Sequence, residues 1–123
     1  MRRAVAVPAL SFFVIAILIV GSALPVFAHA VLMQSKPSAN ATVKGSDVPI
    51  WLRFNVRVDG SRSRLHLIAA DGSEVSLATP KQTAPDILES HATGLKAGAY
   101  TLQWQVLASD GHISRGQVHF TVN

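Results

Sequence analysis

Two segments of this sequence hold side chains that could bind one metal ion together. The first is Asp110-Gly111-His112, where a carboxylate and an imidazole stand two residues apart. In extended backbone such side chains point to the same side, and Gly111 between them would let the backbone approach a ligand closely. Asp110-Gly111 alone is also an ordinary turn, as Asp71-Gly72 is expected to be, so this motif does not decide by itself.

The second segment is His29, which directly follows an apolar leader. Residues 1–28 are typical of a secretory signal peptide, with Arg2 and Arg3 ahead of an apolar run and small residues before His29. Cleavage after Ala28 would make His29 the first residue of the mature chain. Its α-amine, with a usual pKa of ~7.7–8, and its imidazole could then chelate one ion, releasing a proton at neutral pH.

Two alternatives to this cleavage remain open. Ala28-His29-Ala30 is itself an A-x-A pattern, and a cut after Ala30 would discard His29. The apolar run is also nearly long enough to span a bilayer as an uncleaved anchor. We favour cleavage before His29, because Pro25 and small residues follow the run where an anchor more often shows charges.

The combined donor set is three nitrogens and one oxygen, from the His29 amine and imidazole, the His112 imidazole and the Asp110 carboxylate. Cu(II) prefers tetragonal nitrogen and oxygen ligands and leads the affinity order of divalent first-row metals. Zn(II) could accept the same atoms but would favour a tetrahedron. The chain has no cysteine and the expected mature chain has one methionine, Met33, so thiolate sites and a methionine-rich Cu(I) site are not expected.

Most of the chain after the leader alternates apolar and polar residues, with turn residues between the alternating segments. This pattern predicts strands and no long helix. The expected fold is an antiparallel β-sandwich of about seven strands, with Phe54, Tyr100, Trp104 and Phe120 in its core. Strands are predicted at residues 50–58, 64–68, 74–77, 87–91, 100–106 and 117–122, with a break at 59–61 and a loop at 78–86.

The 123 residues therefore predict a signal peptide at 1–28 and one exported domain at 29–123, soluble once cleaved. Without Arg2 and Arg3, nine basic residues face seven acidic ones. No basic run stands out, so a role in binding nucleic acid has little support. The three other histidines are expected to be ordinary strand or surface residues; they are His66, His91 and His119.

The mature chain resembles the CopC family of periplasmic copper-binding, copper-resistance proteins. The resemblance lies in His29-Ala30 and Ser35-Lys36-Pro37, in "VPIWLRFNVRV", in "GLKAGAYTLQWQVLASDGH" and in "GQVHFTV". It implies an immunoglobulin-like or cupredoxin-like Greek-key sandwich without enzymatic activity. It also implies one Cu(II) ion held by His29, Asp110 and His112, and a membrane partner of the CopD type.

The chain departs from the family pattern at one place, and two rival functions remain open. Family members often carry Glu-Pro near the end of the first long strand, where this chain has Asn55-Val56-Arg57, so an auxiliary acid there is in doubt. A histidine-brace copper oxidase would share the N-terminal histidine, and an ascorbate–oxygen assay would distinguish it. A plain β-sandwich binding module would use Asp110-Gly111 only as a turn.

Overall fold

The structure, a computed structural model, describes residues 29–123, so the expected signal peptide lies outside the described residues. The described chain forms strands and no helix, and it contains no helix long and apolar enough to cross a membrane. Nine strands make up the described part: β1 (Leu32–Lys36), β2 (Ala41–Val43), β3 (Val48–Phe54), β4 (Val58–Ala69), β5 (Glu74–Val75), β6 (Lys81–Ala84), β7 (Ile87–Ala92), β8 (Gly98–Ala108) and β9 (Ile113–Val122).

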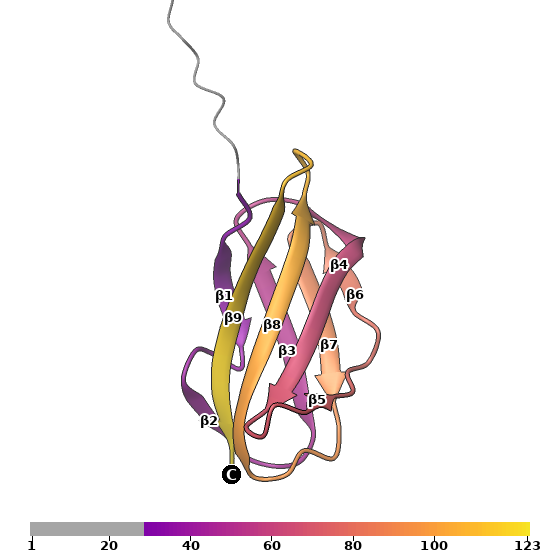
Figure 1. Ribbon diagram of the computed structural model, residues 1–123. Coiled ribbons are helices and arrows are strands. Elements are labelled where there is room, and N and C mark those ends of the chain that lie inside the picture. The colour runs from indigo at the N-terminus through magenta and orange to yellow at the C-terminus, as the bar shows by residue number, and fades with distance from the viewer. Residues whose placement is uncertain (1–28) are drawn as a thin grey trace, which may run out of the picture.

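The strands form two sheets that pack face to face as a sandwich (Figure 1). One sheet has the order β1-β3-β7-β6, and the other has the order β2-β9-β8-β4-β5. Neighbouring strands are antiparallel, except that β2 runs parallel to β9. The expected all-β sandwich is confirmed, with more strands than the predicted seven.

Alternation along the long strands builds the core between the sheets. In β3 every second residue from Val48 to Phe54 is buried, and in β8 every second residue from Tyr100 to Ala108 is buried. Side chains of a strand point alternately to its two faces, so one face of each strand supplies the core. The four predicted core aromatics are all buried: Phe54, Tyr100, Trp104 and Phe120.

The predicted strand at 50–58 is wrong at its C-terminal end. Strand β3 stops at Phe54, and the chain crosses to the other sheet through residues 55–57 before β4 begins at Val58. Alternation continues across this break because Val58 is buried in the same core from the opposite sheet. The crossing is held by Val58 N–H, which donates to Pro85 O at 2.9 Å, and by Ser109 N–H, which donates to Arg57 O at 3.1 Å.

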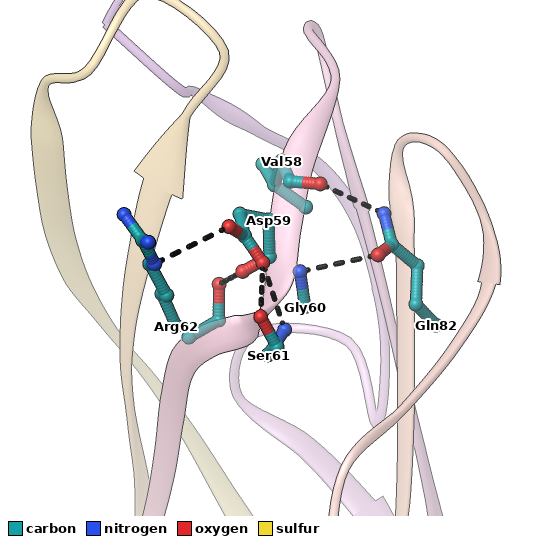
Figure 2. Close-up of polar contacts among 7 residues, drawn as sticks. Val58, Asp59, Gly60, Ser61, Arg62 and Gln82 are labelled. Atoms are coloured by element: carbon teal, nitrogen blue, oxygen red, sulfur yellow. Dashed lines mark hydrogen bonds and ion pairs between the residues drawn. The ribbon is translucent and has the colours of Figure 1, made fainter.

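The predicted break at 59–61 is a distortion within β4, and the predicted loop at 78–86 contains β6. The Asp59 carboxylate accepts hydrogen bonds from the backbone N–H and hydroxyl of Ser61, and the register of β4 against β8 shifts after Asp59 (Figure 2). The Gln82 amide of β6 reaches across to accept from Gly60 N–H at 3.1 Å and donate to Val58 O at 2.8 Å. Gln82 therefore ties the edge of one sheet to the first residues of β4.

Candidate metal centre at one end of the sandwich

Asp110 and His112 lie in the tight loop that joins β8 to β9. Ala108 N–H donates to His112 O at 2.8 Å, and Gly111 N–H donates to Ala108 O at 2.9 Å. Gly111 has φ of 88°, a left-handed conformation that glycine adopts without strain. The motif is therefore a turn, and the expectation of extended backbone between Asp110 and His112 is wrong.

The turn itself brings the carboxylate and the imidazole together. Asp110 Oδ1 accepts a hydrogen bond from His112 N–H at 3.0 Å, and Asp110 Oδ2 lies 3.2 Å from His112 Nδ1. The backbone hydrogen bond from His112 is the main cause that holds the pKa of Asp110 below its usual value, which favours the carboxylate form. This Asx turn therefore places the carboxylate beside the imidazole, which extended backbone was expected to do.

The separation of these two atoms suits adjacent ligands of one ion. With metal–ligand bonds of about 2.0–2.2 Å, neighbouring ligand atoms in square or tetrahedral arrangements lie roughly 2.8–3.5 Å apart. The 3.2 Å between His112 Nδ1 and Asp110 Oδ2 falls in that range. The His112 and Asp110 side chains are 41% and 29% exposed, so the pair lies near the surface, although His112 Nδ1 itself is buried.

His29 lies beside this loop at the same end of the sandwich. In Figure 1 the first described residues and the β8–β9 loop are at one end of the molecule. The His29 and His112 rings have centroids 6.0 Å apart and an interplanar angle of 72°. An imidazole centroid lies about 3 Å from a metal bound to one of its nitrogens, so two rings on one ion are at most roughly 6 Å apart. The observed spacing is at that limit.

The structure joins the three predicted residues as two pairs that share His112. The described residues contain no group of three or more His, Cys, Asp or Glu side chains arranged to hold a metal. The fourth predicted donor is the His29 main-chain nitrogen, which is a peptide amide in the full-length chain and becomes an amine only after cleavage. A complete donor set therefore requires the free N-terminus.

The sequence reasoning missed two residues that hold the start of the domain. Ser114 Oγ accepts a hydrogen bond from Ala30 N–H at 3.0 Å, and Asn55 Oδ1 accepts one from Val31 N–H at 2.7 Å. In the sequence, Ser114 is one serine among many, and Asn55 stands out only as the position that lacks an acid. No local pattern connects them to residues 30 and 31, because they are 84 and 24 residues away.

The remaining histidines lie apart from this end and have ordinary surroundings. His66 Nδ1 is 2.6 Å from Glu74 Oε1 on the outer face of its sheet, and His119 Nδ1 is 2.9 Å from Thr101 Oγ1. His91 is exposed in β7. The prediction that these three are strand or surface residues is confirmed.

Comparison with known proteins agrees with this architecture. The family model described as CopC domain matches residues 32–123. "Protein YobA" of Escherichia coli (strain K12) is 31% identical over 100 residues, covering 79% of this chain and 81% of that protein. "Copper resistance protein C" of Xanthomonas campestris pv. juglandis is 30% identical over 104 residues, covering 78% of this chain and 81% of that protein.

Two solved structures share the whole sandwich. The crystal structure of CopC from Methylosinus trichosporium OB3b matches with a TM-score of 0.72 and 34% identity, over 77% of this chain and 94% of that one. The crystal structure of PcoC, a methionine-rich copper resistance protein from Escherichia coli, matches with a TM-score of 0.69 and 26% identity, over 78% of this chain and 100% of that one. The described part of the present chain carries one methionine, Met33, which separates it in composition from a methionine-rich protein.

Proposed function

This chain belongs to the CopC family of copper-resistance proteins, and from that premise we propose that it binds one Cu(II) ion at the end of the sandwich where His29 meets the β8–β9 loop. The observation that carries the proposal is the shared position of His112. Its ring lies 6.0 Å from the ring of His29, and its Nδ1 lies 3.2 Å from Asp110 Oδ2.

The chemistry of the donors favours copper in its oxidised state. After cleavage before His29, the amine and imidazole of that residue, the imidazole of His112 and the carboxylate of Asp110 would supply three nitrogens and one oxygen. Such donors suit Cu(II), whereas Cu(I) prefers sulfur ligands, of which the described residues hold only Met33. Since Zn(II) could use the same atoms, the preference must be measured.

The role that follows is passive binding in the periplasm, without catalysis. The signal peptide would export the chain, and the mature domain would sequester Cu(II) or carry it to a membrane copper transporter of the CopD type. The partly exposed side chains of Asp110 and His112 support this role, because an ion held between them would lie close to the surface of the protein.

The experiment that tests the site measures the intact mass of the protein purified from the periplasm, with and without one equivalent of Cu(II). A chain that starts at His29 and retains one copper is expected. A chain that starts at Val31, or at Met1, would remove the N-terminal chelate and would favour the plain binding module instead.

Substitution then tests the two side chains of the loop. We expect His112→Ala and Asp110→Ala each to weaken Cu(II) binding sharply in a competition titration, while circular dichroism shows a folded domain. His91→Ala, which removes an exposed imidazole far from the loop in sequence, is the matched control. If both loop variants bound Cu(II) as the wild type does, the ligand assignment would be wrong. An ascorbate–oxygen assay on the copper-loaded protein checks the absence of oxidase activity.

A further inference from the structure

We propose that Ser114 and Asn55 are positioning residues that fix the register of the N-terminus, so that residue 29 and no other lies at the copper site. This inference rests on the proposed copper site. Neither residue offers a ligand to the ion in the proposal. Each instead holds the backbone immediately after His29, Ser114 from β9 and Asn55 from the position directly after β3.

The contact from Ser114 is buried. Ser114 is the second residue of β9, two positions after His112, and is 9% exposed. Its hydroxyl oxygen accepts from Ala30 N–H at 3.0 Å in a buried hydrogen bond. The side chain of Ala30 is itself 4% exposed and belongs to the hydrophobic core. The short segment 112–114 therefore holds both the proposed ligand His112 and Ser114, which anchors Ala30, the residue after the proposed ligand His29.

The contact from Asn55 is a pair of hydrogen bonds. Asn55 Oδ1 accepts from Val31 N–H at 2.7 Å, and Asn55 N–H donates to Val31 O at 3.0 Å. Asn55 follows Phe54, which pairs with Leu32 in the β1–β3 ladder, so these bonds extend the pairing by one residue. At the position where an auxiliary acid was in doubt, Asn55 therefore uses its amide oxygen to accept a backbone hydrogen bond.

Together these contacts hold the backbone that directly follows His29. Three hydrogen bonds and a buried methyl group fix the two residues that follow it. The conformational entropy of the terminus is therefore lost when the protein folds. Its loss does not weaken copper binding, because the terminus is already ordered. The burial of Ala30 also favours this register, because a one-residue slip would place the larger Val31 in the core at that position.

The test uses the mature protein, with Cu(II) alone as the probe. We expect Ser114→Ala and Asn55→Leu each to weaken Cu(II) binding by about tenfold to a hundredfold, the range seen when outer-shell partners of metal sites are removed. Both should also change the electron paramagnetic resonance spectrum at saturating Cu(II), because a displaced terminus alters the ligand geometry. Ser114→Thr and Asn55→Asp keep an acceptor oxygen and should restore binding and spectrum.

Two matched controls lose comparable contacts away from the terminus. Ser63 is also 9% exposed in a strand, and its hydroxyl donates to Asp59 O at 2.6 Å. The side-chain amide of Gln82 also accepts a hydrogen bond from a backbone N–H, that of Gly60, and it donates to Val58 O (Figure 2). Ser63→Ala and Gln82→Leu should lower stability yet leave the Cu(II) affinity and the spectrum as in the wild type.

The outcomes separate this inference from the proposed function. A wild-type mature protein that does not bind Cu(II) would overturn the copper site itself. A wild type that binds Cu(II), with Ser114→Ala and Asn55→Leu equal to the two controls in affinity and spectrum, would overturn the positioning role alone. If Ser114→Ala fails to fold, Asn55→Leu decides, because Asn55 is exposed and its replacement leaves no buried cavity.

Discussion

Two Asp-Gly turns in this domain have the same local construction and differ in one residue. In Asp71-Gly72-Ser73 and in Asp110-Gly111-His112, the aspartate carboxylate accepts from the N–H two residues on, and the glycine N–H bonds back to the residue three before it. Both glycines have positive φ, of 85° and 88°. The backbone of the proposed site is therefore an ordinary turn, and its chemistry comes from the histidine in place of serine.

These paired turns give a prediction with an internal control. Gly111→Ala and Gly72→Ala each force an alanine into the left-handed region, which costs about 1–2 kcal/mol per residue. Both variants should lower the unfolding midpoint by a similar amount. Only Gly111→Ala should also weaken Cu(II) binding, because it disturbs the turn that sets Asp110 against His112. A copper titration and a thermal melt of both proteins check this, and equal copper affinities would contradict it.

At the scale of the strands, the clearest constraint is the packing of β8 against β9. Gly116 faces Trp104 directly in the β8–β9 register, and a Cβ at Gly116 would collide with the indole ring. The indole also packs edge-to-face on Phe54, with ring centroids 5.2 Å apart. The glycine in β9 is thus required by a close approach and not by its backbone angles.

We therefore expect Gly116→Ala to destabilise the domain by about 1–3 kcal/mol, the usual cost of overpacking a core. Urea unfolding followed by tryptophan fluorescence measures this. The double variant Gly116→Ala, Trp104→Phe should lose less stability than the two single changes predict together, because the smaller ring makes room for the added methyl. Additive losses would show that the collision is relieved elsewhere.

A second element-scale prediction concerns the bridge between β6 and β4. Gln82→Leu removes the acceptor for Gly60 N–H and the donor to Val58 O, and the lost hydrogen bonds should cost about 1–3 kcal/mol. Hydrogen exchange should become faster at Gly60, while the strands β8 and β9 keep their protection. Uniformly faster exchange would mean instead that the whole domain had been loosened.

The sequence predicted at least part of six strands, whereas three strands were missed. The predicted ones are β3, β4, β5, β7, β8 and β9, and the missed ones are β1, β2 and β6. Regular alternation marked most of β3 and β8, since each buries one face. The edge strands β1, β2 and β6 are short and largely exposed, so their formation depends on neighbours that lie far away in sequence. The break at 55–57 was hidden because the alternation of buried residues continues from one sheet into the other.

The candidate site was partly predictable for the same reason. Asp110, Gly111 and His112 are local in sequence, and the leader pointed to His29. The hydrogen bonds of Ser114 and Asn55 to residues 30 and 31 could not be predicted, because they join the first described residues to segments 84 and 24 residues away. Candidate metal ligands can be inferred from residue types, whereas the contacts that hold those ligands in place depend on the fold.

For the whole molecule, binding of copper to the folded state should raise stability. A ligand that binds only the native protein adds about 2.7 kcal/mol at a concentration one hundred times its dissociation constant. One equivalent or more of Cu(II) should therefore raise the melting temperature of the mature protein, and a chelator should reverse this. A chain with one additional residue before His29 should show a much smaller rise. An equal rise would mean that the free amine is not a ligand.

The buried position of Ala30 has a consequence for the lifetime of the proposed exported chain. An aminopeptidase that removes the first residue of the mature chain must bind the next residues in an extended, accessible form. Here Ala30 lies in the core and its N–H is bonded to Ser114. Trimming would require the terminus to unpack first, so the fold would also protect the proposed ligand His29 from exopeptidases.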